Sequence, residues 1–182
     1  MSSGDIVPVV IETAFGNIEI DINTGAAPIT AGNFLAHVDE GLYDGGIFHR
    51  TVTLENQRTI NVATSNPDYV IEVIQGGISP EKLPDNLKPI PLERTKDTGL
   101  LHLDGAISMA RGSADSAIEN FFICIGDQPN LDYGTMRNPD GQGFAAFGYV
   151  TSGMDVVKTI QSQPAEGQRL TPTVAIRKIS RK

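Results

Sequence analysis

The sequence predicts a mainly β domain built from about eight short strands and two α-helices. Short apolar segments recur along the chain, and clusters of Gly, Pro, Asn and Asp separate them, as is typical of strands joined by turns. Only two segments carry apolar residues at helical spacing. The chain of 182 residues shows no internal repeat or linker, so we expect one domain over residues 1–182, with its core at about 9–179.

The clearest strand spans Asn17 to Ile22, where three isoleucines alternate with Glu19 and Asp21. Because side chains alternate across a strand, this pattern predicts one buried and one solvated face. The other strands are expected at residues 9–13, 47–52, 69–74, 107–109, 121–124, 144–150 and 173–179. Closure of these strands into a barrel would remove exposed edges, but periodicity alone does not distinguish a barrel from a sandwich.

The first helix is expected to begin near Ala27, because Pro28 is tolerated in a first helical turn, and to end near Gly41. Its apolar face is expected to consist of Ile29, Phe34, Val38 and Leu42. His37 lies on this helix and is expected to be partly exposed. The second helix is expected over Met154–Gln161, with Met154, Val157 and Ile160 pointing inward.

The stretch from Asp104 to Ile125 predicts a hairpin of two apolar strands joined by a loop of small and polar residues. The loop presents Arg111 and Asn120 beside the adjacent Phe121 and Phe122. Such a loop offers an extended peptide free backbone groups and an aromatic floor. We therefore expect this hairpin to hold a peptide.

In the strand at 47–52, alternation places Phe48 and Arg50 on one face and His49 on the other. Catalysis by His49 beside Arg50 would need a distorted strand. After the strand at 69–74, the Q-G-G sequence predicts a close backbone approach or a bend. The polar segment 53–67 is expected to leave the sheet.

The composition excludes several classes of protein. The chain has 14 basic and 22 acidic residues, a net charge of −8 and no basic patch with interleaved aromatics, so nucleic acid is not an expected partner. No apolar run approaches the roughly 20 residues of a membrane-spanning helix. The start M-S-S-G-D lacks the features of a signal peptide, so we expect a cytoplasmic protein, or a periplasmic one if a leader has been removed.

Metal, nucleotide and hydrolase chemistry are not indicated. Asp132, Asn138 and Asp140 lack the spacing and terminal Glu of a calcium loop, and G-Q-G-F-A-A-F-G lacks the dinucleotide-binding spacing. His102 has no evident chemical partner, and no Ser/His/Asp or Cys/His arrangement is supported. The single cysteine, Cys124, is expected to be a core residue.

Seven motifs, in the family's order, give the chain its resemblance to cyclophilin-type peptidyl-prolyl isomerases. They are A-P-I-T-A-G-N-F, Y-D-G-G-I-F-H-R, Q-G-G, G-A-I-S-M-A-R, N-F-F-I-C, L-D-Y-G and F-A-A-F-G-Y-V-x-x-G-M-D-V-V. The likeness covers roughly Val9 to Ile179, and M-A-R-G-S-A-D-S-A resembles the bacterial branch. The resemblance implies a closed eight-stranded antiparallel barrel capped by two α-helices, with a peptide groove on its outer wall and no metal or organic cofactor.

The resemblance also implies the site residues. Arg50 is expected to be the catalytic guanidinium. Val73, Phe122 and Leu131 are expected around the proline ring, and Gln75, Ala110, Arg111 and Asn120 along the peptide backbone. Phe48, Glu72, Asn130 and Phe144 complete the expected substrate contacts.

Four of these residues depart from the common family pattern. Asn120 stands where Gln is usual, Phe144 where many members have His, and Asn130 where Trp or Phe is frequent, which predicts weak binding of cyclosporin-type cyclic peptides. Glu72 stands where the F-x-x-Q-G-G motif has Phe. Two consequences remain open on the sequence. A carboxylate that pairs with Arg50 would compete with the substrate, which predicts reduced turnover, whereas a one-residue bulge would turn Glu72 to solvent and make the change neutral.

Two functions remain open on the sequence alone. The first is a peptidyl-prolyl cis-trans isomerase that accelerates rotation of bonds before proline in peptides and folding proteins. The alternative is a non-catalytic, chaperone-like module that binds proline-containing peptides with weakened turnover. In both cases the expected partners are proline-containing peptides and unfolded client proteins, bound by a monomer.

Overall fold

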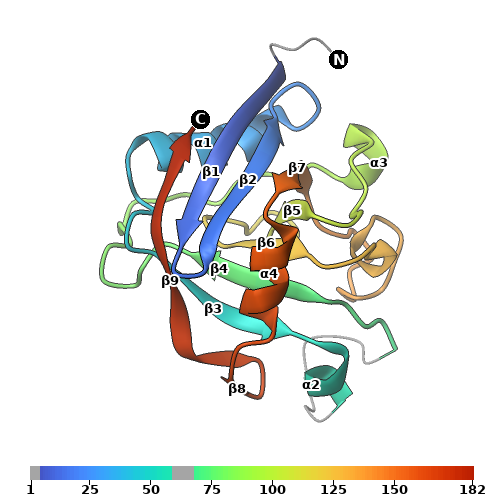
Figure 1. The fold of residues 1–182 in the computed structure, drawn as a ribbon. Coiled ribbons are helices and arrows are strands. Elements are labelled where there is room, and N and C mark those ends of the chain that lie inside the picture. The colour runs from blue at the N-terminus through green and yellow to red at the C-terminus, as the bar shows by residue number, and fades with distance from the viewer. Residues whose placement is uncertain (1–4, 59–67) are drawn as a thin grey trace.

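The computed structural model describes residues 5–58 and 68–182 of the chain. The strands are β1 (Ile6–Thr13), β2 (Gly16–Asn23), β3 (Ile47–Val52), β4 (Val73–Gly77), β5 (Ala106–Met109), β6 (Phe121–Cys124), β7 (Ala146–Ser152), β8 (Ala165–Glu166) and β9 (Arg169–Arg181). All pairings among them are antiparallel, in the order β1-β2-β7-β5-β6-β4-β3-β9, and β9 pairs back to β1 (Figure 1). The two-residue β8 is attached to β9 outside this ring. The predicted closed eight-stranded barrel is confirmed.

The hairpin β1–β2 shows how the sequence pattern builds the barrel wall. The isoleucines of β2 are fully buried, whereas Glu19 and Asp21 between them are only partly buried on the other face. Thr13 pairs with Gly16 across the turn, which fixes the register of the hairpin. The prediction of one buried and one solvated face is therefore correct.

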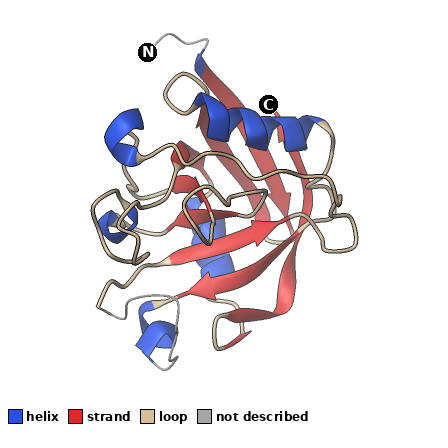
Figure 2. Cartoon of the chain, turned by 180° about the vertical axis from the view of Figure 1, so that it is seen from behind, coloured by secondary structure: helices blue, strands red, loops and turns tan. Residues whose placement is uncertain are grey.

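Two longer helices cover the barrel, as predicted, and Figure 2 shows the first lying across one end of it. These are α1 (Pro28–Asp39) and α4 (Met154–Gln161), and α4 lies against β2, β3 and β4. Three short helices lie in the connections: α2 (Leu54–Arg58), α3 (Thr95–Thr98) and the 3-10 helix η2 (Pro129–Leu131). Within the described residues, no helix is long and apolar enough to span a membrane.

The buried face of α1 differs from the predicted one. Phe34 and Val38 are buried, but Ile29 is 45% exposed. Five positions separate Ile29 from Phe34, which turns them about 140° apart on a helix of 3.6 residues per turn. The face is completed by residues that include His37, which is only 6% exposed and not partly exposed as expected.

The interior of the barrel is filled by an aromatic cluster of Phe34, Tyr43, Phe48, Phe121 and Phe147, all fully buried. Phe121 meets the rings of Phe34 and Phe48 edge to face, at centroid distances of 5.7 and 5.8 Å. Phe122, the next residue, belongs instead to a smaller apolar cluster on the outside of the wall. Strand alternation in β6 thus assigns one Phe to the core and the other to the groove described below.

The Q-G-G sequence lies inside a strand and not after one. The expected strand at 69–74 starts only at Val73 and continues through Gly77. A Cβ atom on Gly76 would lie 2.8 Å from the ring of Phe48, so this glycine allows a close approach of two strands. The expected bend is absent, and the expected close approach is present.

Other boundaries shift by a few residues. β7 begins at Ala146 instead of residue 144, β9 extends well beyond the expected 173–179, and β8 was not expected. The expected polar excursion at 53–67 begins with α2, and its residues 59–67 lie outside the described part of the chain. Cys124 is fully buried, as expected.

Candidate functional site

A groove of about 740 Å³ lies on the outer wall of the barrel, where β3, β4 and β6 meet the loops that follow β5 and η2. Its lining residues are Arg50, Ile71, Val73, Gln75, Leu83, Ala110, Arg111, Gly112, Ser116, Ile118, Glu119, Asn120, Phe122, Leu131, Arg137, Asn138 and Phe144. The structure therefore brings together all the site residues expected from the sequence except Phe48, Glu72 and Asn130.

A β-bulge at His49 directs Arg50 into the groove. Phe48 pairs with Gly76 and Arg50 pairs with Gln75, so His49 has no partner of its own in this ladder. The extra residue places Phe48 in the barrel interior and Arg50 on the outer wall, which alternation alone does not allow. The expectations that these two side chains share a face and that Phe48 contacts a peptide are wrong, because Phe48 is fully buried.

The Arg50 guanidinium is held by two neutral amides. Its Nε and Nη2 donate to Oε1 of Gln168 at 3.0 and 2.7 Å, and its Nη1 donates to Oε1 of Gln75 at 3.0 Å. Gln168 lies in the turn between β8 and β9. Burial lowers the pKa of Arg50, but an arginine of this kind remains protonated near neutral pH.

Gln75 begins a chain of polar contacts along one side of the groove. Its Nε2 donates to Oδ1 of Asn120 at 3.4 Å, and Nδ2 of Asn120 donates to Oε1 of Glu119. The other oxygen of Glu119 accepts the backbone N–H of Ile78 at 2.8 Å. Burial raises the pKa of Glu119, and these two hydrogen bonds oppose the rise. Glu119 was not expected at the site, since one carboxylate beside Asn120 gives no distinct signal.

The side chain of Arg111 is committed to the protein itself. Its guanidinium makes a two-pronged contact with Asp140, at 2.9 and 3.0 Å, and also donates to the carbonyl of Gly143. It stacks over the ring of Phe144 at 4.9 Å and is only 1% exposed. Arg111 therefore offers a peptide its backbone and not its charge.

An apolar wall faces Arg50 across the groove. It consists of Ile71, Val73, Phe122, Leu131 and Phe144. The Phe122 and Phe144 rings meet edge to face, with centroids 5.7 Å apart and planes at 84°. Ile71 was not expected here, although residues 71, 73 and 75 share one face of an extended chain.

Glu72 and Asn130 lie outside the groove lining. Because alternation turns residue 72 away from the Ile71 face, its carboxylate accepts a 3.4 Å hydrogen bond from Gln161. The expected pair between Glu72 and Arg50 is absent, so the reason to expect reduced turnover is removed. Asn130 also turns away, since its Nδ2 donates to the carbonyl of Val70 at 2.8 Å.

His102, to which the sequence analysis gave no partner, lies in a buried network behind the apolar wall. Its Nδ1 is 2.7 Å from Oδ1 of Asp132, its Nε2 is 2.8 Å from Oγ of Ser108, and its ring stacks on Phe122 at 6.0 Å. Burial lowers the pKa of His102, while Asp132 opposes this shift. Ser108 is fully buried, so this arrangement positions Phe122 but does not present a nucleophile to a peptide.

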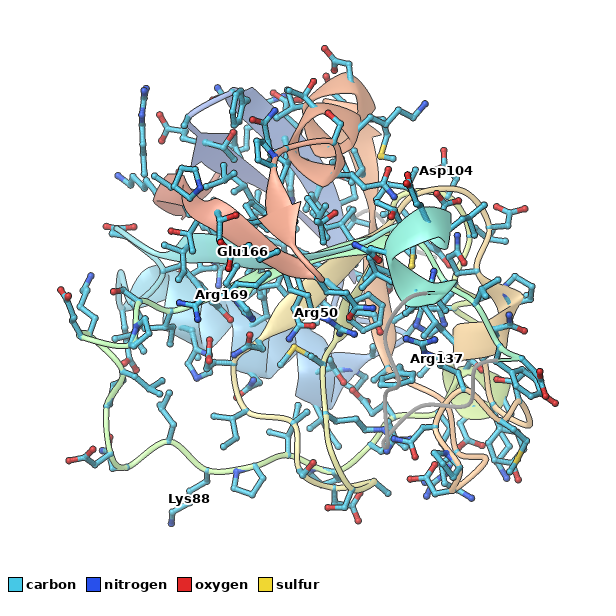
Figure 3. The ribbon with its side chains drawn as sticks, turned by 90° about the horizontal axis from the view of Figure 1, so that it is seen from below. Arg50, Lys88, Asp104, Arg137, Glu166 and Arg169 are labelled. Carbon is cyan, nitrogen blue, oxygen red and sulfur yellow. The ribbon has the colours of Figure 1, made fainter. Side chains whose placement is uncertain are left out.

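A further guanidinium, that of Arg137, lines the groove and was missed by the sequence analysis. Arg137 follows η2 and is only 7% exposed. Figure 3 shows Arg50 between Arg137 on one side and the β8–β9 hairpin, with Glu166 and Arg169, on the other. Neither Arg137 nor Gln168 lies in a motif, and only the tertiary fold brings them to Arg50.

Comparison with known proteins decides the family. The family model for the cyclophilin-type peptidyl-prolyl cis-trans isomerase matches residues 8–181. The chain belongs to this cyclophilin family. The cyclophilin relatives in bacteria include peptidyl-prolyl cis-trans isomerase cyp18 of Streptomyces antibioticus, which is 35% identical over 83% of this chain and 81% of that protein.

Another cyclophilin relative is peptidyl-prolyl cis-trans isomerase A of Dickeya dadantii, 35% identical over 87% of this chain and 73% of that protein. Among solved structures, a cyclophilin-type isomerase of Cryptosporidium parvum superposes with a TM-score of 0.72, covering 97% of this chain and 98% of that chain. That structure is 20% identical in sequence, so it supports the cyclophilin fold alone.

Proposed function

We propose that this chain catalyses cis-trans isomerisation of the peptide bonds that precede proline. Rotation about a peptide bond has a barrier of about 18–20 kcal/mol, because the nitrogen lone pair is delocalised into the carbonyl. Before proline the two isomers are nearly equal in energy but exchange in tens to hundreds of seconds. A catalyst therefore has to stabilise the twisted transition state, with no bond to form or break.

The observation that carries the proposal is the fixed position of Arg50 in the groove. Of its five N–H groups, three donate to Gln168 and Gln75, which leaves one on each terminal nitrogen. In the twisted state the proline nitrogen becomes pyramidal and its lone pair can accept a hydrogen bond. A guanidinium already held in place stabilises that state more than either planar isomer.

The apolar wall supports the same reaction. Phe122, Val73 and Leu131 are almost completely buried in the protein and present apolar surface beside Arg50, as a site for a proline ring requires. Excluding water there strengthens the interaction between the guanidinium and the reacting nitrogen. Gln75, Asn120 and the backbone near Ala110 would align the peptide along the groove.

The proposed partners are proline-containing peptides and unfolded proteins. The net charge of −8 argues against a nucleic-acid partner. We further propose a monomer, because closure of the eight main strands leaves only the short β8 as a free edge among the described residues.

The test is exchange spectroscopy by NMR on the peptide Ala-Ala-Pro-Phe, with wild type and with Arg50→Gln. We expect wild type to accelerate exchange between the cis and trans signals. Arg50→Gln should lose most of the acceleration while the peptide still shifts the protein resonances of the groove. Peptide binding without acceleration by wild type would overturn the isomerase proposal in favour of a binding module.

A further inference from the structure

Arg137 is a buried cation, and its hydrogen bonds to the described residues all go to neutral groups. Its Nη1 donates to the carbonyl of Tyr69 at 2.9 Å and to Oε1 of Gln57 at 3.2 Å. No described residue accepts a hydrogen bond from its Nε or Nη2. Arg137 is only 7% exposed as a residue and lines the groove, so its guanidinium keeps donors available to a ligand.

The electrostatic surroundings of Arg137 make this placement costly. None of the ion pairs among the described residues involves Arg137 or Arg50. Burial, with repulsion from Arg50 as the second cause, lowers the pKa of Arg137 to about 10, so it remains a cation at neutral pH. Burying an unpaired charge next to a like charge is unfavourable, and such arrangements are typical of binding sites.

The rest of the groove does not supply the missing negative charge. The carboxylate of Asp140 is already paired with Arg111. Glu119, the one acidic residue among those that line the groove, is bound to the N–H of Ile78 and to Asn120. The groove therefore carries unbalanced positive charge in a chain whose net charge is −8.

We propose that Arg137 forms an anion-binding subsite that selects peptides with a Glu or Asp side chain next to the proline. The inference rests on the proposed isomerase function and names its substrate class. A carboxylate that enters the groove would accept charge-assisted hydrogen bonds from the free donors of Arg137 and would supply the missing counter-charge. A neutral amide of the same shape would do neither.

The experiment compares two matched pairs of peptides. Ala-Glu-Pro-Phe is paired with Ala-Gln-Pro-Phe, and Ala-Ala-Pro-Glu with Ala-Ala-Pro-Gln, so the charge lies before or after the proline. Both the rate of catalysed exchange and the Kd from NMR titration are measured. We expect wild type to prefer Glu over Gln about tenfold in at least one pair, which corresponds to about 1.4 kcal/mol.

Substitution of Arg137 separates recognition from a structural role. Arg137→Met should bring the Glu/Gln ratio close to one, whereas Arg137→Lys should retain part of the preference. If Arg137 only braces the Tyr69 and Gln57 segments, both peptides of a pair would weaken equally and the ratio would persist. Arg177→Met, an exposed arginine on β9 outside the groove, is the matched control and should keep the ratio.

Salt provides a test that needs no variant. Raising the ionic strength from about 0.01 to about 1 M shortens the Debye length from about 30 to about 3 Å, and the wild-type ratio should fall. A wild-type ratio near one at low salt in both pairs overturns the subsite, even where exchange is accelerated. Absence of accelerated exchange overturns the isomerase proposal instead, and the Kd ratio still tests the subsite.

Discussion

Gln168 holds the Arg50 guanidinium in place, and removal of the Gln168 amide should lower turnover without unfolding the protein. Its Oε1 accepts two of the three hydrogen bonds that fix Arg50, at 3.0 and 2.7 Å. Its Nε2 is buried and finds no hydrogen-bond partner within residues 5–58 and 68–182, so the amide positions Arg50 at some cost to stability. We expect Gln168→Met to leave Gln75 as the only amide contact of the guanidinium.

The size of this effect follows from the contacts. Hydrogen bonds to charged groups contribute about 1.5–3 kcal/mol each, and water will replace part of the two that are lost. A net loss of about 1.4–2.8 kcal/mol in transition-state stabilisation corresponds to a tenfold to hundredfold fall in kcat/KM. Removal of the unpartnered Nε2 offsets the lost bonds, so the free energy of unfolding should change by less than about 1 kcal/mol.

The assay is NMR exchange on Ala-Ala-Pro-Phe, together with urea unfolding of the same variants. Gln163→Met is the matched control, because the Gln163 amide donates to Thr159 and does not line the groove. A wild-type kcat/KM in Gln168→Met would show that Gln168 does not position Arg50. A loss of activity that only follows a loss of folded protein would show the same.

Two further predictions concern the charge of Glu72 and the titration of His102. Glu72→Gln should change the exchange rate less than about twofold, because the carboxylate contacts Gln161 and not Arg50; a large gain would mean that it competes with the substrate. For His102, burial lowers the folded-state pKa below the usual 6.5, so its stabilisation is complete above about pH 6.5 and is lost as pH falls through the folded-state pKa. His102→Gln should flatten the fall in the free energy of unfolding between about pH 7 and 5, measured by urea titration, and an unchanged slope would contradict this.

The parts of the fold that follow local pattern rules could be predicted from the sequence. The alternation in β2 predicts the correct buried face, because local periodicity determines it. The helical spacing in α4 is correct for Val157 and Ile160, whereas Met154 is only partly buried and the buried Val156 was not expected. The closed barrel came from the family resemblance, since strand spacing does not distinguish closure from a sandwich. The predicted buried face of α1 is wrong at Ile29, because Ile29 and Phe34 do not lie on the same side of a helix.

The site could be predicted only in part. The bulge at His49 puts Phe48 and Arg50 on opposite faces of the strand. A bulge adds one residue without changing the hydrophobic pattern, so the sequence does not indicate it. The family motif predicts a substrate contact at residue 72. In the structure Ile71, which precedes β4 by two residues, lines the groove instead of Glu72. The contacts of His102 and Gln168 join residues far apart in sequence, so no local pattern could reveal them.

The most direct test of the central claim is the rate of cis-trans exchange of a peptide while it is bound, measured by NMR at saturating protein. This rate separates stabilisation of the twisted state from simple affinity. Loss of a preorganised donor of this kind typically costs about 100-fold to 1000-fold, so we expect Arg50→Gln to fall by at least about 100-fold and Arg50→Lys to lie between it and wild type. A bound-state rate that is the same in wild type and Arg50→Gln would contradict the account.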